Sequence, residues 1–358
     1  MAGLDPLPID ARVRQEQRRR LGVLVGATRF ATQQGTEESF RLDLVDLDAY
    51  GGAPAGIGLP FAGHGLALRP GSSREAVIFE KRGRGGCAVD LVARRVIKSI
   101  EPTAGHAFYG HCAYAPSGNV LFIVETQLGS LEGAISVRDP DTFAVLGTIP
   151  TYGVAPHDCH ILEDGRTLVV TNGGGPVTSP YLPSVTFIDV NSRALVEQHE
   201  FREFNWNAGH VAVLAGRAFA AVSAARDGLA SPLPPGGVTL RRCGDSPIGM
   251  SMPKSVTSRL LGESLSVAID PTSRVVCATH PAADLVTFWS LDAGALESSL
   301  ELPQPRGVTM TLDGRFFAVS YGVDARVLLV EALTLRVVTG RRVGAGMLGG
   351  AHLYTWTG

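Results

Sequence analysis

The chain has 358 residues, of which 45% are hydrophobic and only 18% charged, with 43 glycines and 22 prolines. This composition is typical of many short buried strands joined by tight turns, and it argues against a disordered or mainly helical chain. Lys and Arg total 32 against 34 Asp and Glu. The near balance gives no indication of a nucleic-acid partner or of attraction to an anionic membrane.

No apolar run reaches the ~18 residues that a membrane-spanning helix requires. Residues 18–27 faintly resemble a twin-arginine export signal, but the apolar part at 21–27 is too short and is interpreted as a strand. The sequence as given therefore predicts a cytoplasmic protein, or a periplasmic one if an export signal has been removed. The five widely spaced cysteines include no C-x-x-C pair, so buried free thiols are expected.

Residues 1–19 show no periodicity and are predicted to form a loose N-terminal arm. Three predicted strands follow, at 21–28, 40–47 and 54–60. Six units then share one pattern: an entry strand, a Pro-Ser-Gly or Asp-Gly type turn, an apolar strand, a polar loop, a strand ending in Asp, and a last strand. They span residues 64–100, 111–150, 157–201, 210–262, 265–302 and 307–343.

The fourth of these units is irregular, because 231–237 is rich in proline and 244–262 has no clear period. One entry strand remains at the C-terminus, at 350–356, and it is expected to join the three N-terminal strands as a seventh unit. Residues 20–358 are therefore predicted to form one all-β domain, a seven-bladed β-propeller closed by pairing the C-terminal strand with the N-terminal strands. A two-sheet sandwich is the alternative, but it does not explain the repeat.

Four of the units begin near a histidine: His64, His111, His157 and His210, at intervals of 47, 46 and 53 residues. The entry strands of a propeller line its central channel, so these side chains are predicted to meet at one mouth of the channel. His64 and His157 stand six residues before the turn, and the other two stand five. A shift of one residue turns a strand side chain to the opposite face, and a bulge can absorb it.

Converging imidazoles are typical of a transition-metal site. Four nitrogen ligands without thiolates favour iron or copper, with zinc as a further possibility, and leave one or two coordination positions for water or substrate. The competing interpretation is structural: each histidine alone would donate a hydrogen bond to a carbonyl of the neighbouring blade.

Other residues are candidates for supporting roles. His106 is expected on the loop entering the second unit, as a fifth ligand or a gate. Glu125 and Asn172 end the second strands of their units and either orient a histidine or cap a loop. Arg306 either meets an anionic ligand or hydrogen-bonds a loop carbonyl. The last unit places Gly349 and Gly350 before His352 at the matching position.

The remaining histidines and two of the cysteines are expected to be structural or solvated. His160 is predicted on the opposite strand face from His157, and His199 and His280 are predicted to be solvated. Cys112 and Cys159 are predicted to pack in the core, with a role as soft ligands left open. Neither a G-x-S-x-G nor an H-E-x-x-H motif is present, so hydrolytic chemistry has no candidate.

The Gly-His-Gly, Tyr-Gly-His and Pro-His motifs resemble an uncharacterised bacterial propeller family. The resemblance covers roughly residues 60–330 and is carried by 63–65, 108–111, 156–157 and 168–174. Members carry a domain of unknown function and are often encoded beside imelysin-type iron-uptake proteins and di-haem oxidoreductases. The resemblance implies seven blades, export by a twin-arginine signal and a role with iron, and it carries over His64, His106, His111, His157 and His210.

This chain departs from the family pattern by lacking the signal and by having Asp158-Cys159-His160 after the third motif. A more distant analogy links it to propeller dioxygenases that hold iron(II) with four channel histidines. Three hypotheses follow. The first is a metal-binding propeller handling iron or copper. The second is a metal-dependent oxidoreductase that activates oxygen at the same site, with residues 226–262 covering a small-molecule substrate. The third is a scaffold for partner proteins with structural histidines.

Overall fold

The computed structural model describes residues 20–31, 38–49, 55–202, 205–229, 236–323, 326–338 and 348–358. The predicted arm at 1–19 and the prolines at 232–235 lie outside these residues. Within them the fold is all-β, as predicted, with one four-residue helix, α2 (Lys254–Thr257), and two short 3-10 turns at Ala215–Arg217 and Pro281–Ala283. No helix in the described ranges has the length and apolar character needed to cross a membrane.

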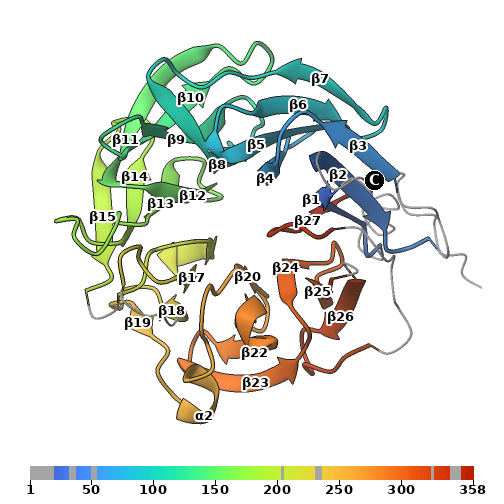
Figure 1. Cartoon of the computed structure of the whole chain (residues 1–358), viewed down its shortest axis with the longest axis vertical. Helices are drawn as coiled ribbons and strands as arrows, with labels where there is room; N and C mark the ends of the chain where they lie inside the picture. The colour runs from blue at the N-terminus through green and yellow to red at the C-terminus, as the bar shows by residue number, and fades with distance from the viewer. Residues whose placement is uncertain are drawn as a thin grey trace, which may run out of the picture.

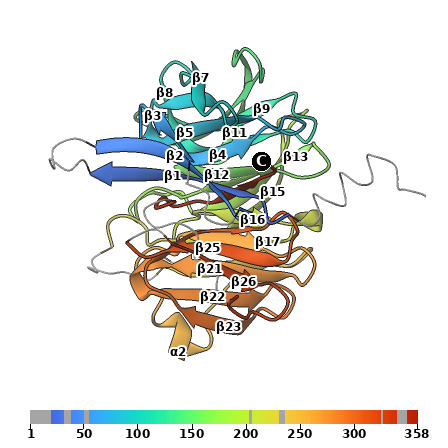
Figure 2. The ribbon, with the colours of Figure 1, turned by 90° about the vertical axis from the view of Figure 1, so that its right-hand side faces the viewer.

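The two ends of the chain meet in one antiparallel sheet. It has the order β27-β1-β2-β3 and consists of β1 (Val23–Ala31), β2 (Glu38–Asp46), β3 (Ala55–Leu59) and β27 (Tyr354–Trp356). Val23 of β1 lies opposite Trp356 of β27, so the C-terminal strand pairs directly with the first strand, as predicted. Figure 2 shows β1 and β2 projecting together from the rest of the molecule.

The next sheet is eight-stranded and combines two consecutive units of the sequence pattern. Its strands are β4 (Gly63–Leu68), β5 (Glu75–Gly83), β6 (Gly86–Asp90), β7 (Arg95–Ser99), β8 (His106–Tyr114), β9 (Leu121–Gln127), β10 (Glu132–Arg138) and β11 (Val145–Val154). The two units are joined because the end of β5 pairs with β8, Lys81 opposite Tyr109. β8 begins at His106 and not at His111 as expected, because its first residues, from His106 to Phe108, pair with the end of β9.

Three four-stranded sheets and one three-stranded sheet follow in chain order. They consist of β12 (Pro156–Ile161), β13 (Thr167–Asn172), β14 (Ser184–Asp189) and β15 (Leu195–Glu200); β16 (Val211–Val213), β17 (Phe219–Ser223), β18 (Gly237–Arg241) and β19 (Ile248–Gly249); β20 (Ser266–Ile269), β21 (Val275–His280), β22 (Leu285–Ser290) and β23 (Ala295–Glu301); β24 (Pro305–Met310), β25 (Phe316–Tyr321) and β26 (Arg326–Glu331).

Two of these sheets have a weaker outer strand than the sequence pattern predicts. The irregular unit has an outer strand of only two residues, Ile248–Gly249, with the helix α2 shortly after it. The last strand predicted at 335–341 appears only as an isolated bridge between Val330 and Val337, and residues 339–341 of it lie outside the described part of the chain.

The sheets are arranged side by side around a common centre, as in a propeller (Figure 1). The entry strands β4, β12, β20 and β24 lie toward the centre, and β7, β15 and β23 lie at the periphery. Burial follows this arrangement. All six residues of β13 are buried, whereas exposed and partly buried residues alternate along β23. A middle strand is covered on both faces by neighbouring sheets, and an outer strand meets solvent.

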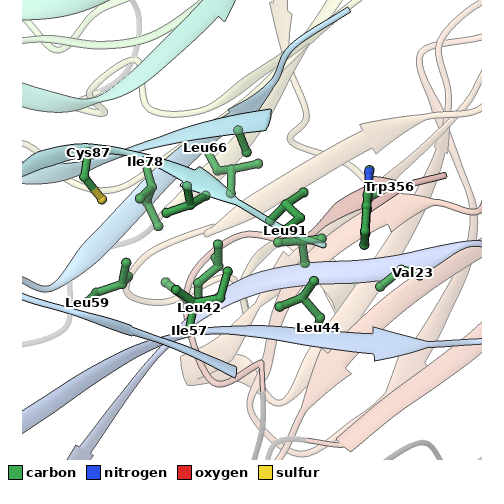
Figure 3. Packing of buried hydrophobic residues seen from close by; sticks show 14 of the residues in the cluster. Val23, Leu42, Leu44, Ile57, Leu59, Leu66, Ile78, Cys87, Leu91 and Trp356 are labelled. Carbon is green, nitrogen blue, oxygen red and sulfur yellow. The ribbon is translucent and has the colours of Figure 1, made fainter. Parts of the chain in front are cut away.

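The hydrophobic core is a series of layers between adjacent sheets. In the layer of Figure 3, Leu42 and Ile57 of the first sheet pack against Leu66 and Ile78 of the second. Trp356 of β27 belongs to the same layer, and its indole N–H donates to the carbonyl of Ser73 at 3.0 Å. The C-terminal strand is therefore fixed by packing as well as by pairing. This frame holds the entry strands, and with them the histidines, in place.

Candidate metal centre

Local irregularities in the entry strands position the histidines. The pairing register shifts between Gly63 and Gly65 in β4, between Phe108 and Cys112 in β8, and between Pro156 and Cys159 in β12. Each shift brackets one of the motif histidines. An extra residue in a strand re-aims the side chain beside it, so His64, His111 and His157 can converge although they stand five or six residues before the turn. His210 lies directly before β16, outside the paired residues.

The four predicted histidines converge, and a fifth joins them. The ring centroids of His64 and His111 lie 4.9 Å apart, and those of His157 and His210 lie 4.4 Å apart. His352 lies two residues before the C-terminal strand, and its ring centroid lies 4.1 Å from that of His210 and 4.7 Å from that of His64. We call these five residues the histidine cluster. All except His64 are buried.

Two glycines make room for the rings. Gly110 has φ +101°, a conformation that favours glycine, and a Cβ there would lie 2.5 Å from Cδ2 of His64. A Cβ on Gly65 would lie 2.1 Å from the carbonyl oxygen of Gly110 and 2.8 Å from Nδ1 of His111. The Gly-His-Gly and Gly-His motifs are therefore a packing requirement, since a larger residue would push the imidazoles apart.

A carboxylate orients His111. Nδ1 of His111 lies 3.2 Å from Oδ1 of the buried Asp158, and the negative charge of the carboxylate favours a proton on that nitrogen. The lone pair is then on Nε2, which is buried and has no hydrogen-bond partner among the described residues. An imidazole held by a carboxylate, with its other nitrogen unpaired, is the usual arrangement of a metal ligand.

His210 is oriented by a backbone carbonyl. Its Nδ1 donates to the carbonyl oxygen of Leu265 at 2.6 Å, which leaves Nε2 as the acceptor nitrogen of the neutral ring. That Nε2 lies 2.7 Å from Nε2 of His157, and Nε2 of His64 lies 3.4 Å from Nε2 of His352. The Nε2 atoms therefore point toward one another at the centre of the cluster.

Burial keeps the cluster uncharged at neutral pH. It lowers the pKa of His64, His157, His210 and His352 well below the ordinary value. Protonating one ring is further disfavoured by the neighbouring imidazoles and, for all but His210, by Lys81, while Asp158 opposes the shift for His157 and His352. Burial also lowers the pKa of His111, to about 4, against the opposing effect of Asp158. Neutral imidazoles have free lone pairs, which is the form that binds metal.

The side chain of Asp158 links the cluster to a further histidine. Burial raises its pKa, but interactions with His111 and His160 outweigh this and leave it well below the ordinary value, so the group is ionised. Its Oδ2 accepts from the amide of Val211 at 3.1 Å and lies 3.4 Å from Nε2 of His160. His160 thus has the structural position expected of it.

The cluster has the dimensions of a metal site. One ring nitrogen from each of His64, His111, His210 and His352 can be chosen so that all four lie within 4.8 Å of one another. Ligands bound at about 2.1 Å on opposite sides of one ion would be about 4.2 Å apart, so the cluster can hold a metal with small side-chain movements. The donors are all imidazole nitrogens, which suit iron, copper, zinc and nickel.

Two important residues were missed at the sequence level. His352 was recognised at the matching position of the last unit but not counted as a ligand, although the glycines before it repeat the Gly-His pattern. Asp158 was noted only as a departure from the family motif. A carboxylate directly after a motif histidine, at a register shift, could have indicated its role.

Two of the predicted supporting residues lie elsewhere. His106 is not on a loop: it is the first residue of β8, opposite Gln127, and its Nδ1 contacts the carbonyl of Ala104. Glu125 is buried and contacts no histidine; it pairs with Arg138 at 2.8 Å and accepts from the amide of Thr103. It therefore holds a loop, which was the other role considered for it.

The other two supporting residues also have structural partners. Asn172 donates to the carbonyl of Thr151 at 3.1 Å. Arg306 donates to the carbonyl of Gly350 at 3.3 Å, the loop-carbonyl bond weighed for it, and its charge contributes to the lowered pKa of His352.

The cysteines and outer histidines complete the account. Cys112 and Cys159 pack in separate hydrophobic layers, and burial raises the pKa of both thiols, so they remain protonated. The expectation of solvated outer histidines is wrong. His280 is buried between the hydroxyls of Ser264 and Thr287, each at 2.8 Å, and His199 lies 2.9 Å from Glu197. Polar partners inside the sheets make both rings structural.

A cavity of about 320 Å³ adjoins the cluster. His157 and His210 line it, together with Lys81, Arg82 and Tyr109. The arrangement as a whole defines a propeller-like all-β protein with a histidine cluster that can hold a metal ion, next to a space large enough for a small molecule.

Comparison with known proteins assigns the family. The chain belongs to the family of proteins of unknown function DUF1513, whose model matches residues 57–347. No curated protein matches the chain. The uncharacterised family expected from the motifs is thus shown, whereas its gene neighbourhood is not.

Solved structures show the same fold at low sequence identity. A hypothetical selenium-binding protein from Sulfolobus tokodaii matches with a TM-score of 0.67 and 13% identity over 94% of this chain and 91% of its own. Hydrazine synthase from Kuenenia stuttgartiensis matches with a TM-score of 0.65 and 16% identity over 84% of this chain and 94% of its own. At these identities the likeness concerns the fold alone.

Proposed function

We propose that this protein is a metal-binding β-propeller that holds one transition-metal ion, iron or copper, in the histidine cluster. The observation that carries the proposal is the unpaired, buried Nε2 of His111, with Nδ1 fixed by Asp158. A buried nitrogen without a hydrogen-bond partner costs about 1–3 kcal/mol. A metal ion at the centre of the cluster removes that cost.

The proposed ligands are the four predicted residues His64, His111, His157 and His210, joined by His352. The Nε2 atoms of His157 and His210 are 2.7 Å apart, which is a hydrogen-bond distance and slightly shorter than two ligands of one ion require. In the proposal the metal replaces the proton shared by these two rings. Iron and copper are favoured because the donors are imidazoles without thiolate, and zinc is the third choice.

The proposal includes a seven-bladed ring over residues 20–358 as a single domain. The described sheets support it, because the eight-stranded sheet contains two successive units and each other sheet contains one. The pairing of β27 with β1 supports closure between the two ends of the chain. In such a ring the histidine cluster lies at one mouth of the central channel, and the iron-related role implied by the family resemblance becomes reasonable.

A metal-dependent oxidoreductase is the second candidate, and the cavity beside His157 and His210 favours it. A site that only stores or passes a metal needs no adjoining space for a second molecule. Oxygen consumption by the iron- or copper-loaded protein, measured with candidate reductants, distinguishes the two functions. A scaffold with structural histidines is the third reading, and it requires no metal.

Metal analysis of the full chain, purified without chelator, tests the proposal. We expect close to one equivalent of iron or copper, and at least a hundredfold weaker binding after His111→Ala or His210→Ala. His106→Ala is the matched control, because this ring lies outside the cluster, and it should bind metal normally. Absence of metal in the wild type after reconstitution, with unchanged thermal stability on adding iron, copper or zinc, would contradict the proposal.

A further inference from the structure

The cavity beside the histidine cluster has a deep end and an outer end, and β8 defines the direction. His111 belongs to the cluster, Tyr109 lies two residues before it opposite Lys81, and Ala107 lies four residues before it opposite Thr126. Lys81, Tyr109, Ala107 and Thr126 all line the cavity. Moving back along β8 from His111 therefore leads from the metal site, past Lys81, to the surface.

The deep end carries an ammonium group that the protein does not neutralise directly. Lys81 is partly buried and has no hydrogen-bond or ion-pair partner among the described residues. It lines the same cavity as His157 and His210, and it lies opposite Tyr109, two residues before His111. A cation beside a site for another cation is unfavourable unless an anion lies between them.

A second cation and a phenol stand next to Lys81. Arg82 donates from Nε to the Tyr109 hydroxyl at 3.0 Å, and its guanidinium lies 5.4 Å from the centre of that ring. No ion pair of Arg82 with a carboxylate exists within the described ranges. The acidic side chains that line the same cavity are Asp227 and Glu263. Burial lowers the pKa of Lys81 below its usual value, and the charge of the exposed Glu263 opposes this without a direct contact.

The outer end of the cavity is apolar. Leu128 and Leu131 line it and are 61% and 40% exposed, which is unusual for large hydrophobic side chains. Ala107 and Ala155 lie on the same lining. The cavity therefore offers cations beside the metal site and an apolar surface farther out.

We propose that this cavity binds a small carboxylate with a short apolar body, its head between Lys81 and the metal and its body against Leu128 and Leu131. The metal contact rests on the proposed function, whereas the contacts to Lys81 and the leucines do not. A cavity of about 320 Å³ is at the small end of ligand pockets, which fits a metabolite-sized acid. The carboxylate would supply the anion that separates the two cations and would fill an open coordination position.

Butyrate is the probe, and its neutral isostere butyramide is the matched ligand control. The full chain is loaded with cobalt(II), whose visible absorption reports on its coordination, and then titrated with each compound. We expect butyrate to change the spectrum and butyramide to leave it unchanged at ten times the concentration. Equal responses to the two compounds would overturn the proposal.

Lys81→Gln tests the cation, with Lys254→Gln on the exposed helix α2 as the matched control. We expect about tenfold weaker butyrate binding for Lys81→Gln, because a charge-assisted hydrogen bond is lost, and no change for the control. Both variants should still bind one equivalent of cobalt. Unchanged butyrate binding in Lys81→Gln would refute the role of Lys81.

Chain length tests the apolar end. Hexanoate should bind more tightly than acetate to the wild type, and Leu128→Asn should remove most of that difference because the side chain is exposed and its replacement does not disturb the core. If the chain binds neither cobalt nor iron, copper or zinc, the proposed function fails. Calorimetric titration of butyrate into the metal-free protein and into Lys81→Gln then decides the role of Lys81 separately.

Discussion

The entry strands on two sides of the molecule are built alike but differ in what they present. On one side β4, β8 and β12 carry His64, His111 and His157. On the other side β20 and β24 carry no histidine. The comparison separates what the fold needs from what the site adds.

The two sides share one structural feature, a buried threonine on the second strand of the sheet. In the third unit, the hydroxyl of Thr171 accepts from the amide of Asp158 at 2.9 Å and donates to the carbonyl of Gly209 at 2.6 Å. In the fifth unit, the hydroxyl of Thr279 accepts from the amide of Ser266 at 3.1 Å and donates to the carbonyl of Arg306 at 2.6 Å. Each hydroxyl ties its own entry strand to the entry residue of the next sheet.

The difference lies in the residues that these bonds hold. Asp158 and His157 in the third unit correspond to Ser266 and Leu265 in the fifth. The carbonyl of Leu265 accepts from His210, so the side without histidines still orients one ligand through its backbone. The same frame therefore provides side-chain ligands on one side and backbone support on the other.

Acid is expected to affect the histidine side most strongly. The five cluster histidines bind protons in the unfolded chain near pH 6.5 but not in the folded chain until much lower pH, about 4 for His111. The unfolded state then binds more protons, and stability falls as pH drops below 6.5, by about 1.4 kcal/mol per pH unit for each such histidine. His160, whose pKa is raised, opposes this, because its contribution to stability is present below pH 6.5 and is lost at higher pH.

Urea denaturation of the metal-free protein at pH 8, 6.5 and 5 measures this effect. We expect a loss of about 2 kcal/mol between the first two values, because each histidine is half protonated in the unfolded chain at pH 6.5, and a several-fold larger loss at the third. His280 lies on the other side, and burial lowers its pKa to about 3, so it adds the pH dependence of a single histidine to the stability. His280→Gln should therefore keep most of the pH dependence, and a midpoint that is the same at pH 8 and pH 5 would show that the cluster is not buried as described.

The next largest effect is expected from Asp158→Asn. The neutral amide lacks the charge that attracts Nδ1 of His111 from 3.2 Å, so the ring loses its fixed orientation and metal affinity should fall by about 10- to 100-fold. Asp270→Asn is the matched control, because Asp270 is also buried but accepts from Thr272 and Ser273 in a turn. It should lower stability and leave metal affinity unchanged. Competition titration with a chromogenic chelator measures both, and equal affinities would exclude a positioning role for Asp158.

The sequence allowed much of the fold to be predicted because the signals are local. Strand period, turn residues and apolar runs located nearly all the described strands and predicted that the C-terminal strand pairs with the N-terminal strands, which β27 does through β1. The start of β8 was misplaced, because His106 and Ala107 pair with Gln127 and Thr126, beyond the point at Glu125 where the facing strand was expected to end. The pairing of Lys81 with Tyr109 was not foreseen either, since a pattern within one unit cannot indicate pairing with another.

Part of the site was also predictable, because the repeat is a signal that can be read along the sequence. The repeat indicated that His64, His111, His157 and His210 lie at matching positions, and their rings do meet. His352 and Asp158 were missed as members of the site because their roles depend on the three-dimensional arrangement. Asp158 faces His111, 47 residues earlier in the chain, and only the adjacency of β12 and β8 brings the two together.

The smallest predicted effect is a few-fold change in metal affinity, and it tests the comparison between the two sides of the molecule most directly. Thr171→Val and Thr279→Val remove the same two hydrogen bonds from buried positions, so each should cost about 1–3 kcal/mol, and the two costs should agree closely. Only Thr171 supports Asp158, so its variant alone should weaken metal binding, by a few-fold. Urea denaturation and metal titration of both variants measure the two quantities. If Thr279→Val weakens metal binding as much, the backbone of the side without histidines is as much a part of the site as the ligands themselves.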